Sequence, residues 1–196
     1  MITIIDYGAG NLRSIHRAIE ACGGAAEISG DPDRIAKADR LVLPGVGNAK
    51  AAMNQLRSTG MADALMERAA AGTPLLGVCL GMQLLFGAQE EGPTTGLGLM
   101  EGTVVRLPEN HKVPHMGWNQ VAFRADSSLA DFPTSSFYFV HSYMVQPTHE
   151  QDIAGETDYG VTFPSVVVHD TIWGTQFHPE KSQQAGLALI ERWLRI

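Results

Sequence analysis

The sequence predicts an α/β fold: a doubly wound, mostly parallel sheet with an antiparallel extension. In the first 86 residues, short apolar runs rich in β-branched residues alternate with segments of helical periodicity, which is typical of parallel sheets covered by helices on both faces. Beyond residue 103, β-prone runs follow one another until a final amphipathic helix. A chain of 196 residues is expected to form a single domain, 1–196.

Composition narrows the class of protein. The chain is 44% hydrophobic and 18% charged, as ordinary globular proteins are. Its net charge of -7, with no basic block, argues against nucleic-acid binding. No apolar run is long enough for a membrane span, and the first residues lack a basic segment and a cleavage site, so no signal peptide is expected. The two cysteines are expected to be free thiols in a reducing compartment, and we therefore expect a cytoplasmic protein.

The first half is expected to alternate regularly between strands and helices. Strands are expected over 2–5, 25–29, 40–43 and the run that ends at Cys79, and helices over 12–22, from a cap at Asp33 to residue 38, over 49–58, over 61–71 and from Cys79 to 86. Gly8 and Gly10 follow the first strand, but the third glycine of a dinucleotide-binding turn is missing. We therefore do not predict a dinucleotide site.

The second half is less regular. Residues 87–102 are rich in glycine and show little periodicity, residues 103–107 are expected to form a strand, and 111–118 are mixed. Three β-prone runs, 137–145, 160–168 and 171–177, are predicted to form the antiparallel extension. The closing helix is expected over 183–195, with Leu187, Ile190 and Leu194 on one face.

The most informative stretch places a cysteine between two glycines, in the pattern Gly77-Val78-Cys79-Leu80-Gly81. Small residues on both flanks are typical of a nucleophile elbow, a sharp turn between a strand and a helix. A helix N-terminus favours a thiolate, and its free N–H groups can bind an oxyanion. The alternative is that Cys79 is a small buried hydrophobic residue, as most free cysteines are.

A cysteine nucleophile needs a base, and His178 is the best-placed histidine. It follows a β-prone run, precedes Pro179, and has Glu180 two residues further on, so both side chains can point the same way. His141 lies in a strand and is a structural or substrate-contact candidate. The others have no comparable partner and are expected on a helix surface, in turns or in irregular stretches: His16, His111, His115, His149 and His169.

These residues predict a cysteine hydrolase or acyl transferase without a metal, because no zinc-ligand spacing is present. A loop with two glycines, 44–47, follows the third strand. Such a loop either lets a backbone N–H turn towards a ligand or is a plain strand-to-helix turn.

Two motifs, 77–83 and 176–182, resemble those of class I, triad-type glutamine amidotransferases, whose fold the chain is then expected to share. Four further stretches, 5–12, 43–47, 113–119 and 139–143, resemble the glutaminase subunits of imidazole glycerol phosphate synthases. The likeness covers essentially the whole chain, except that 124–136 carries no matching motif and an aromatic residue expected soon after 44–47 is missing.

The resemblance implies a mechanism and a set of residues. Cys79 attacks the side-chain amide of glutamine, His178 protonates the leaving ammonia and then activates water, and Glu180 orients His178. The backbone of Leu80 and the loop at Val46 and Gly47 form the oxyanion hole. Residues implied to hold glutamine are Gln83, Glu91, His141, Ser142 and Tyr143. No cofactor is implied.

The resemblance also implies a partner, a (β/α)8 cyclase subunit in a heterodimer. The cyclase uses the ammonia to form imidazole glycerol phosphate and an aminoimidazole carboxamide ribotide (AICAR) in histidine biosynthesis. Residues implied to face it are Asn11, Met116, Trp118 and Lys181. For Trp118 the alternative is a partly buried surface aromatic. Because such glutaminases are nearly silent alone, we expect the Val46 loop to act as a switch whose N–H is misaligned in the free subunit.

Three other functions stay open at this stage. The chain could be a different glutamine amidotransferase, such as the glutaminase of pyridoxal phosphate synthase or of anthranilate synthase, although the stretch 115–119 disfavours this. It could be an inert scaffold of the same fold, against which Cys79, His178 and Glu180 argue. It could also be an unrelated cysteine peptidase or esterase, which would act without a partner protein.

Overall fold

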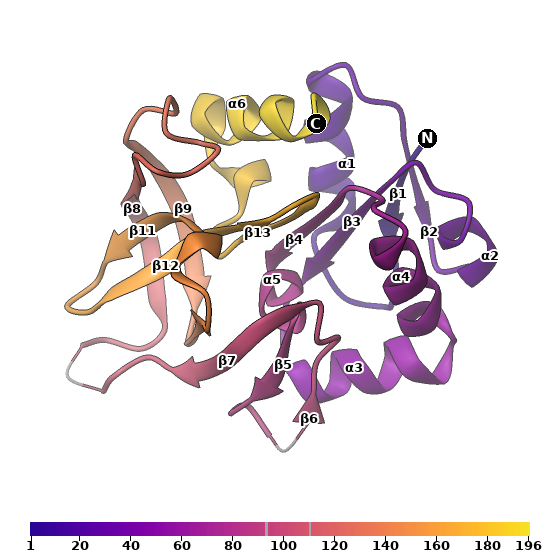
Figure 1. Ribbon diagram of the computed structural model, residues 1–196, viewed down its shortest axis with the longest axis horizontal. Helices are drawn as coiled ribbons and strands as arrows, with labels where there is room; N and C mark the ends of the chain where they lie inside the picture. Colours follow the sequence, from indigo (N-terminus) through magenta and orange to yellow (C-terminus); the bar gives the residue numbers. More distant parts are fainter. Residues whose placement is uncertain (93, 110) are drawn as a thin grey trace.

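The computed structural model describes residues 1–92, 94–109 and 111–196, and it contains a nine-stranded sheet (Figure 1). Its order is β2-β1-β3-β4-β13-β12-β11-β8-β9. From β2 to β13 neighbouring strands are parallel, and from β13 to β9 they are antiparallel. The strand bounds are β1 Ile2–Ile5, β2 Ala26–Ser29, β3 Arg40–Gly45, β4 Leu75–Cys79, β8 His115–Phe123, β9 Ser135–His141, β11 Ile153–Asp158, β12 Thr162–His169 and β13 Ile172–Thr175. The predicted fold class is confirmed.

A second sheet of four strands, which the sequence did not predict, has the order β10-β7-β5-β6. Its strands are β5 Phe86–Gln89, β6 Thr94–Thr95, β7 Met100–Arg106 and β10 Tyr143–Pro147. Two glycines of 87–102, a stretch that suggested a loop, serve close strand packing. A Cβ at Gly96 would lie 2.0 Å from the Phe86 carbonyl oxygen, and one at Gly102 would lie 2.4 Å from that of Gln146.

The β-prone run 137–145 was predicted as one strand, and this is wrong. The chain crosses at Ser142 from β9 in the large sheet to β10 in the small one. Two further expectations change in the same region. β8 forms where 111–118 was expected to be mixed, and the strand at 171–177, β13, is antiparallel only to β12 and parallel to β4.

Helices cover both faces of the large sheet (Figure 1). Helices α1 (Leu12–Ala21) and α6 (Gln183–Leu194) pack on one face, and α3 (Ala49–Ser58) and α4 (Met61–Ala70) pack on the other. The short segments are α2 (Pro32–Ile35), α5 (Leu80–Leu84) and the 3-10 turns η1 (Glu150–Asp152) and η2 (Pro179–Lys181).

Helices α2 and α5 differ most from those predicted, and α2 already ends at Ile35, not at residue 38. The cap of α2 is Asp31, because its carboxylate accepts the Asp33 backbone N–H at 2.9 Å and Pro32 occupies the first helical position. Helix α5 ends at Leu84, and not near residue 86, because Phe86 already begins β5.

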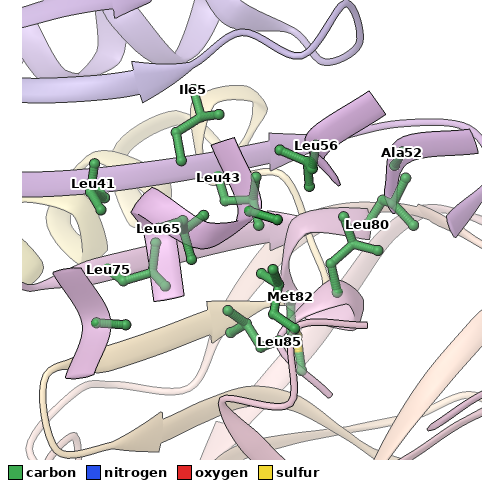
Figure 2. Packing of buried hydrophobic residues seen from close by; sticks show 14 of the residues in the cluster. Ile5, Leu41, Leu43, Ala52, Leu56, Leu65, Leu75, Leu80, Met82 and Leu85 are labelled. Atoms are coloured by element: carbon green, nitrogen blue, oxygen red, sulfur yellow. The ribbon is translucent and has the colours of Figure 1, made fainter. Parts of the chain in front are cut away.

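Alternation along the central strands separates two hydrophobic clusters. Ile4 packs towards α1 and α6, whereas Ile5 belongs to the cluster under α3 and α4. Figure 2 shows the second cluster, in which strand side chains such as Leu43 and Leu75 meet Leu65. Each fully buried aliphatic side chain contributes roughly 1.5–3 kcal/mol to stability. The packed strands give the site a rigid frame, because Cys79 is the last residue of β4.

Candidate active site

The turn predicted at Cys79 is present and is conformationally strained. Cys79 has φ 55° and ψ -110°, which few non-glycine residues adopt. The flanking glycines are required by space: a Cβ at Gly81 would lie 1.8 Å from the Leu43 carbonyl oxygen, and one at Gly77 would lie 2.9 Å from the Gly81 backbone. Strand β4 and helix α5 thus meet in a turn that places Cys79 at the carboxyl end of β4.

His178 and Glu180 form a buried pair beside this turn. Nδ1 of His178 lies 2.9 Å from Oε1 of Glu180, and both side chains are only 2% exposed. Because a carboxylate accepts, Nδ1 carries a proton and Nε2 is left for the nucleophile. Burial opposes protonation, but hydrogen bonding and charge attraction from Cys79 and Glu180 outweigh it and raise the pKa of His178 to about 9.

A cavity of about 360 Å³ brings together ten of the eleven residues predicted for catalysis, the oxyanion hole and glutamine binding. This volume is in the range of small-molecule sites. The eleventh residue, Glu180, contacts the side of His178 and is absent from the lining. Two lining residues, Pro114 and Val140, were not predicted. The ten are Val46, Gly47, Cys79, Leu80, Gln83, Glu91, His141, Ser142, Tyr143 and His178.

Two side-chain amides, of which Gln83 lines the cavity, connect the cavity wall with the Cys79 sulfur. Nε2 of Gln83 donates to the Tyr143 carbonyl at 3.0 Å and to Oε1 of Gln176 at 3.1 Å. Nε2 of Gln176 in turn lies 3.9 Å from the Cys79 sulfur. Gln176 lay inside a motif used for the resemblance but received no role from the sequence. Elsewhere in the cavity, the Glu91 carboxylate accepts the Ala49 N–H at 2.8 Å, at the start of α3.

The expectation that His115 lies in an irregular stretch without a partner is wrong. It begins β8, is 3% exposed, and its Nδ1 lies 3.0 Å from Nε2 of His141. Burial lowers the pKa of His115 to about 4, and burial is also the main cause that lowers the pKa of His141 to about 3. Strand pairing places the two residues opposite each other, which no local pattern reveals.

The loop after β3 lies against the elbow. Gly45 is the register partner of Cys79, and a Cβ at Gly45 would lie 2.8 Å from the Gly81 nitrogen. Val46 is 44% exposed at the cavity edge, and Gly47 has φ +93°. The loop is therefore close enough for the predicted oxyanion contact, which stays a prediction, as does its role as a switch.

Three of the four residues predicted to face a partner lie near one another. Met116 and Trp118 are 62% and 51% exposed on the same side of β8. Trp118 meets the Tyr138 ring edge-on at 6.1 Å, and the Lys181 ammonium lies 5.8 Å from the centre of that ring. Tyr138, which the sequence did not single out, thus joins two predicted residues. Asn11 precedes α1 at its N-cap position.

Among the described residues, no three His, Cys, Asp or Glu side chains are placed to bind a metal ion together. None of the helices in these same ranges has the length and apolar character that a membrane crossing requires.

Comparison with known proteins gives one family and one fold. The family model for glutamine amidotransferase class-I matches residues 3–195. Imidazole glycerol phosphate synthase subunit HisH of Geobacillus thermodenitrificans (strain NG80-2) is 48% identical over 100% of this chain and 96% of its own length. The subunit of the same name from Methanopyrus kandleri (strain AV19) is also 48% identical, over 96% of this chain and 94% of its own.

Solved structures share the fold at low identity. One described as a glutamine amidotransferase has a TM-score of 0.81 at 18% identity and covers 100% of this chain and 99% of its own. Another, PurLQS from Thermotoga maritima, contains a chain with a TM-score of 0.74 at 15% identity, covering 99% of this chain and 95% of its own.

Proposed function

The chain belongs to the class-I glutamine amidotransferase family, and on this premise we propose that it is the glutaminase subunit of an imidazole glycerol phosphate synthase. It hydrolyses glutamine to glutamate and ammonia, and the ammonia supplies histidine biosynthesis. The proposal rests on one geometric observation: the Cys79 elbow, His178 and the predicted glutamine-binding residues line the same cavity.

In the proposed mechanism the Cys79 thiolate attacks the side-chain amide carbon of glutamine. The carbonyl oxygen becomes an oxyanion, and the C–N bond then breaks as protonated His178 gives its Nε2 proton to the leaving nitrogen. Ammonia departs and a thioester remains. Neutral His178 next takes a proton from water, whose oxygen attacks the thioester, so that glutamate leaves and the thiolate returns. The raised pKa of His178 supports its protonation before the first step.

Backbone N–H groups of Leu80 and of the loop at Val46 and Gly47 are proposed to bind the oxyanion. In comparable sites one such donor contributes about 3–4 kcal/mol to transition-state binding. Gly45 pairs with Cys79, so a small change of the loop would move its donor relative to the sulfur. This closeness supports the proposed switch, in which the loop aligns only when the partner is bound. The glutamine itself is proposed to contact Gln83, Glu91, His141, Ser142 and Tyr143.

The proposed partner is a (β/α)8 cyclase subunit, which receives the ammonia within a heterodimer and forms imidazole glycerol phosphate and AICAR. Exposed Met116 and Trp118, together with Lys181 beside Tyr138, support a docking surface there, since exposed aromatic residues are enriched in interfaces. Asn11 is proposed to complete it.

Two broader assignments accompany this one. We propose that residues 1–196 act as one glutamine amidotransferase domain, which the family match over 3–195 supports. We also propose a cytoplasmic location, because Cys22 and Cys79 are both free and a nucleophilic thiol must stay reduced.

The test is glutamate release from glutamine, with and without the cyclase subunit and its nucleotide ligand. We expect strong stimulation by the cyclase, complete loss in Cys79→Ala, and retention in Cys22→Ala, which removes the half-buried thiol outside the cavity. Full activity of the chain alone would contradict the coupling. Activity that survives in Cys79→Ala would contradict the proposed nucleophile, and hydrolysis of ester or peptide substrates without the cyclase would favour an unrelated hydrolase.

A further inference from the structure

Two buried histidines on neighbouring strands have a contact that the glutaminase mechanism does not explain. His115 begins β8, His141 ends β9, and each is the other's register partner. They are 3% and 5% exposed, and their facing nitrogens lie 3.0 Å apart. His115 is absent from the cavity lining, so its function must be exerted through another residue.

The partners of each ring determine where the protons lie. Nδ1 of His141 is 2.8 Å from the Tyr143 carbonyl oxygen, which can only accept, so Nδ1 carries a proton and Nε2 accepts. Nδ1 of His115 therefore donates to His141. Nε2 of His115 is left to accept from Nδ2 of Asn119, at 3.3 Å. Both rings thus have the proton on Nδ1.

The orientation of Asn119 is fixed as well. Its Oδ1 accepts the Gln120 N–H at 2.8 Å, and its Nδ2 also donates to the Asp158 carbonyl at 2.8 Å. A second proton on either imidazole would point an N–H at another N–H, so the network is satisfied only when both rings are neutral. The lowered pKa values of His115 and His141 agree with this.

Aromatic side chains hold the outer ring in place. His115 stacks between Phe139, at a centroid distance of 4.8 Å, and Tyr159, at 4.0 Å. The ring therefore cannot turn without displacing residues from β9 and from the turn after β11. Its hydrogen bond to His141 is correspondingly well oriented.

The pair continues into the catalytic cavity through the Tyr143 carbonyl. This oxygen accepts from His141 and also from Gln83, which bonds to Gln176. Gln176 contacts the Cys79 sulfur at 3.9 Å. A continuous polar path therefore leads from β8 to the nucleophile. The same strand exposes Met116 and Trp118, the proposed docking residues, between its inward-facing side chains.

We propose that His115 is a positioning residue of the glutaminase site: with His141 it forms a neutral imidazole pair that holds the Tyr143 carbonyl and, through Gln83 and Gln176, the surroundings of Cys79. This rests on the proposed function and adds to it a route by which the docking strand reaches the site. The pair lies where the chain passes from the large sheet to the small one, so it also fixes the junction from which the glutamine pocket is built.

Two matched substitutions test the hydrogen bond itself. The amide of His115→Asn can reach the position of Nδ1 and still donate to His141, whereas the amide of His115→Gln lies at the position of Nε2 and cannot. In the complex with the cyclase, we expect KM for glutamine to rise about tenfold in His115→Gln, as for the loss of one oriented hydrogen bond, with a smaller change in kcat. We expect His115→Asn to stay within about threefold of the unsubstituted chain.

His149→Gln is the control, because His149 is half-exposed, pairs with Glu101 and lies outside the cavity. Unchanged KM in His115→Gln, or equal loss in the Asn and Gln variants, would overturn the proposal, since packing alone would then explain the residue. The unsubstituted chain gives an independent readout. Nitrogen-15 NMR at pH 7 should show His115 and His141 as neutral rings protonated on Nδ1.

A His141 ring protonated on Nε2 would overturn the proposal without any activity measurement. The NMR result also separates the proposed role of His115 from the proposed glutaminase function. If glutamine is not hydrolysed even with the cyclase, the proposed function fails, and the histidine pair still stands or falls on its proton positions.

Discussion

Two buried pairs that contain histidine, His178 with Glu180 and His115 with His141, lie beside the same cavity and differ in charge. His178 is buried and contacts a carboxylate, and its pKa is raised to about 9. His115 is 3% exposed and contacts a second imidazole and an amide, and burial lowers its pKa to about 4. Burial alone lowers the pKa of an imidazole, whereas at His178 hydrogen bonding and charge attraction from its neighbours outweigh burial.

The difference suits the chemistry proposed for each side. His178 must hold a proton for the leaving ammonia, so Glu180 and the Cys79 sulfur stabilise its charge. His141 lies close enough to His178 for its own pKa to be lowered further by that neighbour. A second positive ring there would repel the charge on His178. The neutral pair can therefore position its neighbours without opposing that charge.

The largest expected effect comes from making the charged pair neutral. Glu180→Gln keeps the size of the side chain but removes the anion, so the pKa of His178 should fall and the imidazolium should be lost at neutral pH. We expect kcat with the cyclase bound to fall about 10⁴-fold, as for the orienting carboxylates of other catalytic triads. Glu191→Gln, on the outer surface of α6, is the control and should keep its activity. A loss below tenfold would show that Glu180 does not maintain the charge.

The pH dependence of glutamine hydrolysis tests the same charge in the unsubstituted chain. Since the first step needs protonated His178, kcat/KM should fall as the pH rises through about 9, by up to tenfold per pH unit above it. Glu180→Gln should shift this alkaline limb to lower pH. The measurement is glutamate release from pH 6 to 10 in the complex with the cyclase. A flat profile to pH 10 would contradict the proton donor.

The sequence predicted the charged pair far better than the neutral one, for a physical reason. Cys79 lies between two glycines, and His178 has its carboxylate two residues away, so local spacing contains most of the geometry. His115 meets His141 26 residues further along the chain and is stacked by Phe139 and Tyr159 from elsewhere. Such a contact depends on strand pairing, which hydrophobic patterns do not specify.

The fold, like the site, has one part that the sequence predicted and one that it did not. The parallel order of β1, β3 and β4 could be predicted, because these strands are largely apolar runs bounded by helices, whereas β13 was assigned to the antiparallel extension. The small sheet could not, because its glycines look like loop residues and because β9 and β10 read as one β-prone run across Ser142. In β8, the inward-facing His115 and Asn119 are polar, so the usual alternation was hidden.

The smallest expected effect concerns the pH dependence of the free energy of unfolding, to which the two pairs contribute with opposite signs. The pKa values of His115 and His141, about 4 and about 3, lie below the unfolded value of about 6.5. The unfolded chain therefore binds more protons in this window, and the free energy of unfolding should fall below pH 6.5, by at most about 1.4 kcal/mol per pH unit for each ring. The contribution of His178, whose pKa is raised, is instead complete below about pH 6.5 and lost as the pH rises towards 9.

Urea unfolding at pH 5, 6.5 and 8.5 separates the acid contribution of His115 and His141 from the alkaline contribution of His178. His115→Phe should make the acid slope shallower and leave the alkaline slope unchanged, whereas His149→Phe, at a half-exposed site, should retain the acid slope. If His115→Phe has the acid slope of the unsubstituted chain, the buried ring does not resist protonation and the contrast between the two pairs fails.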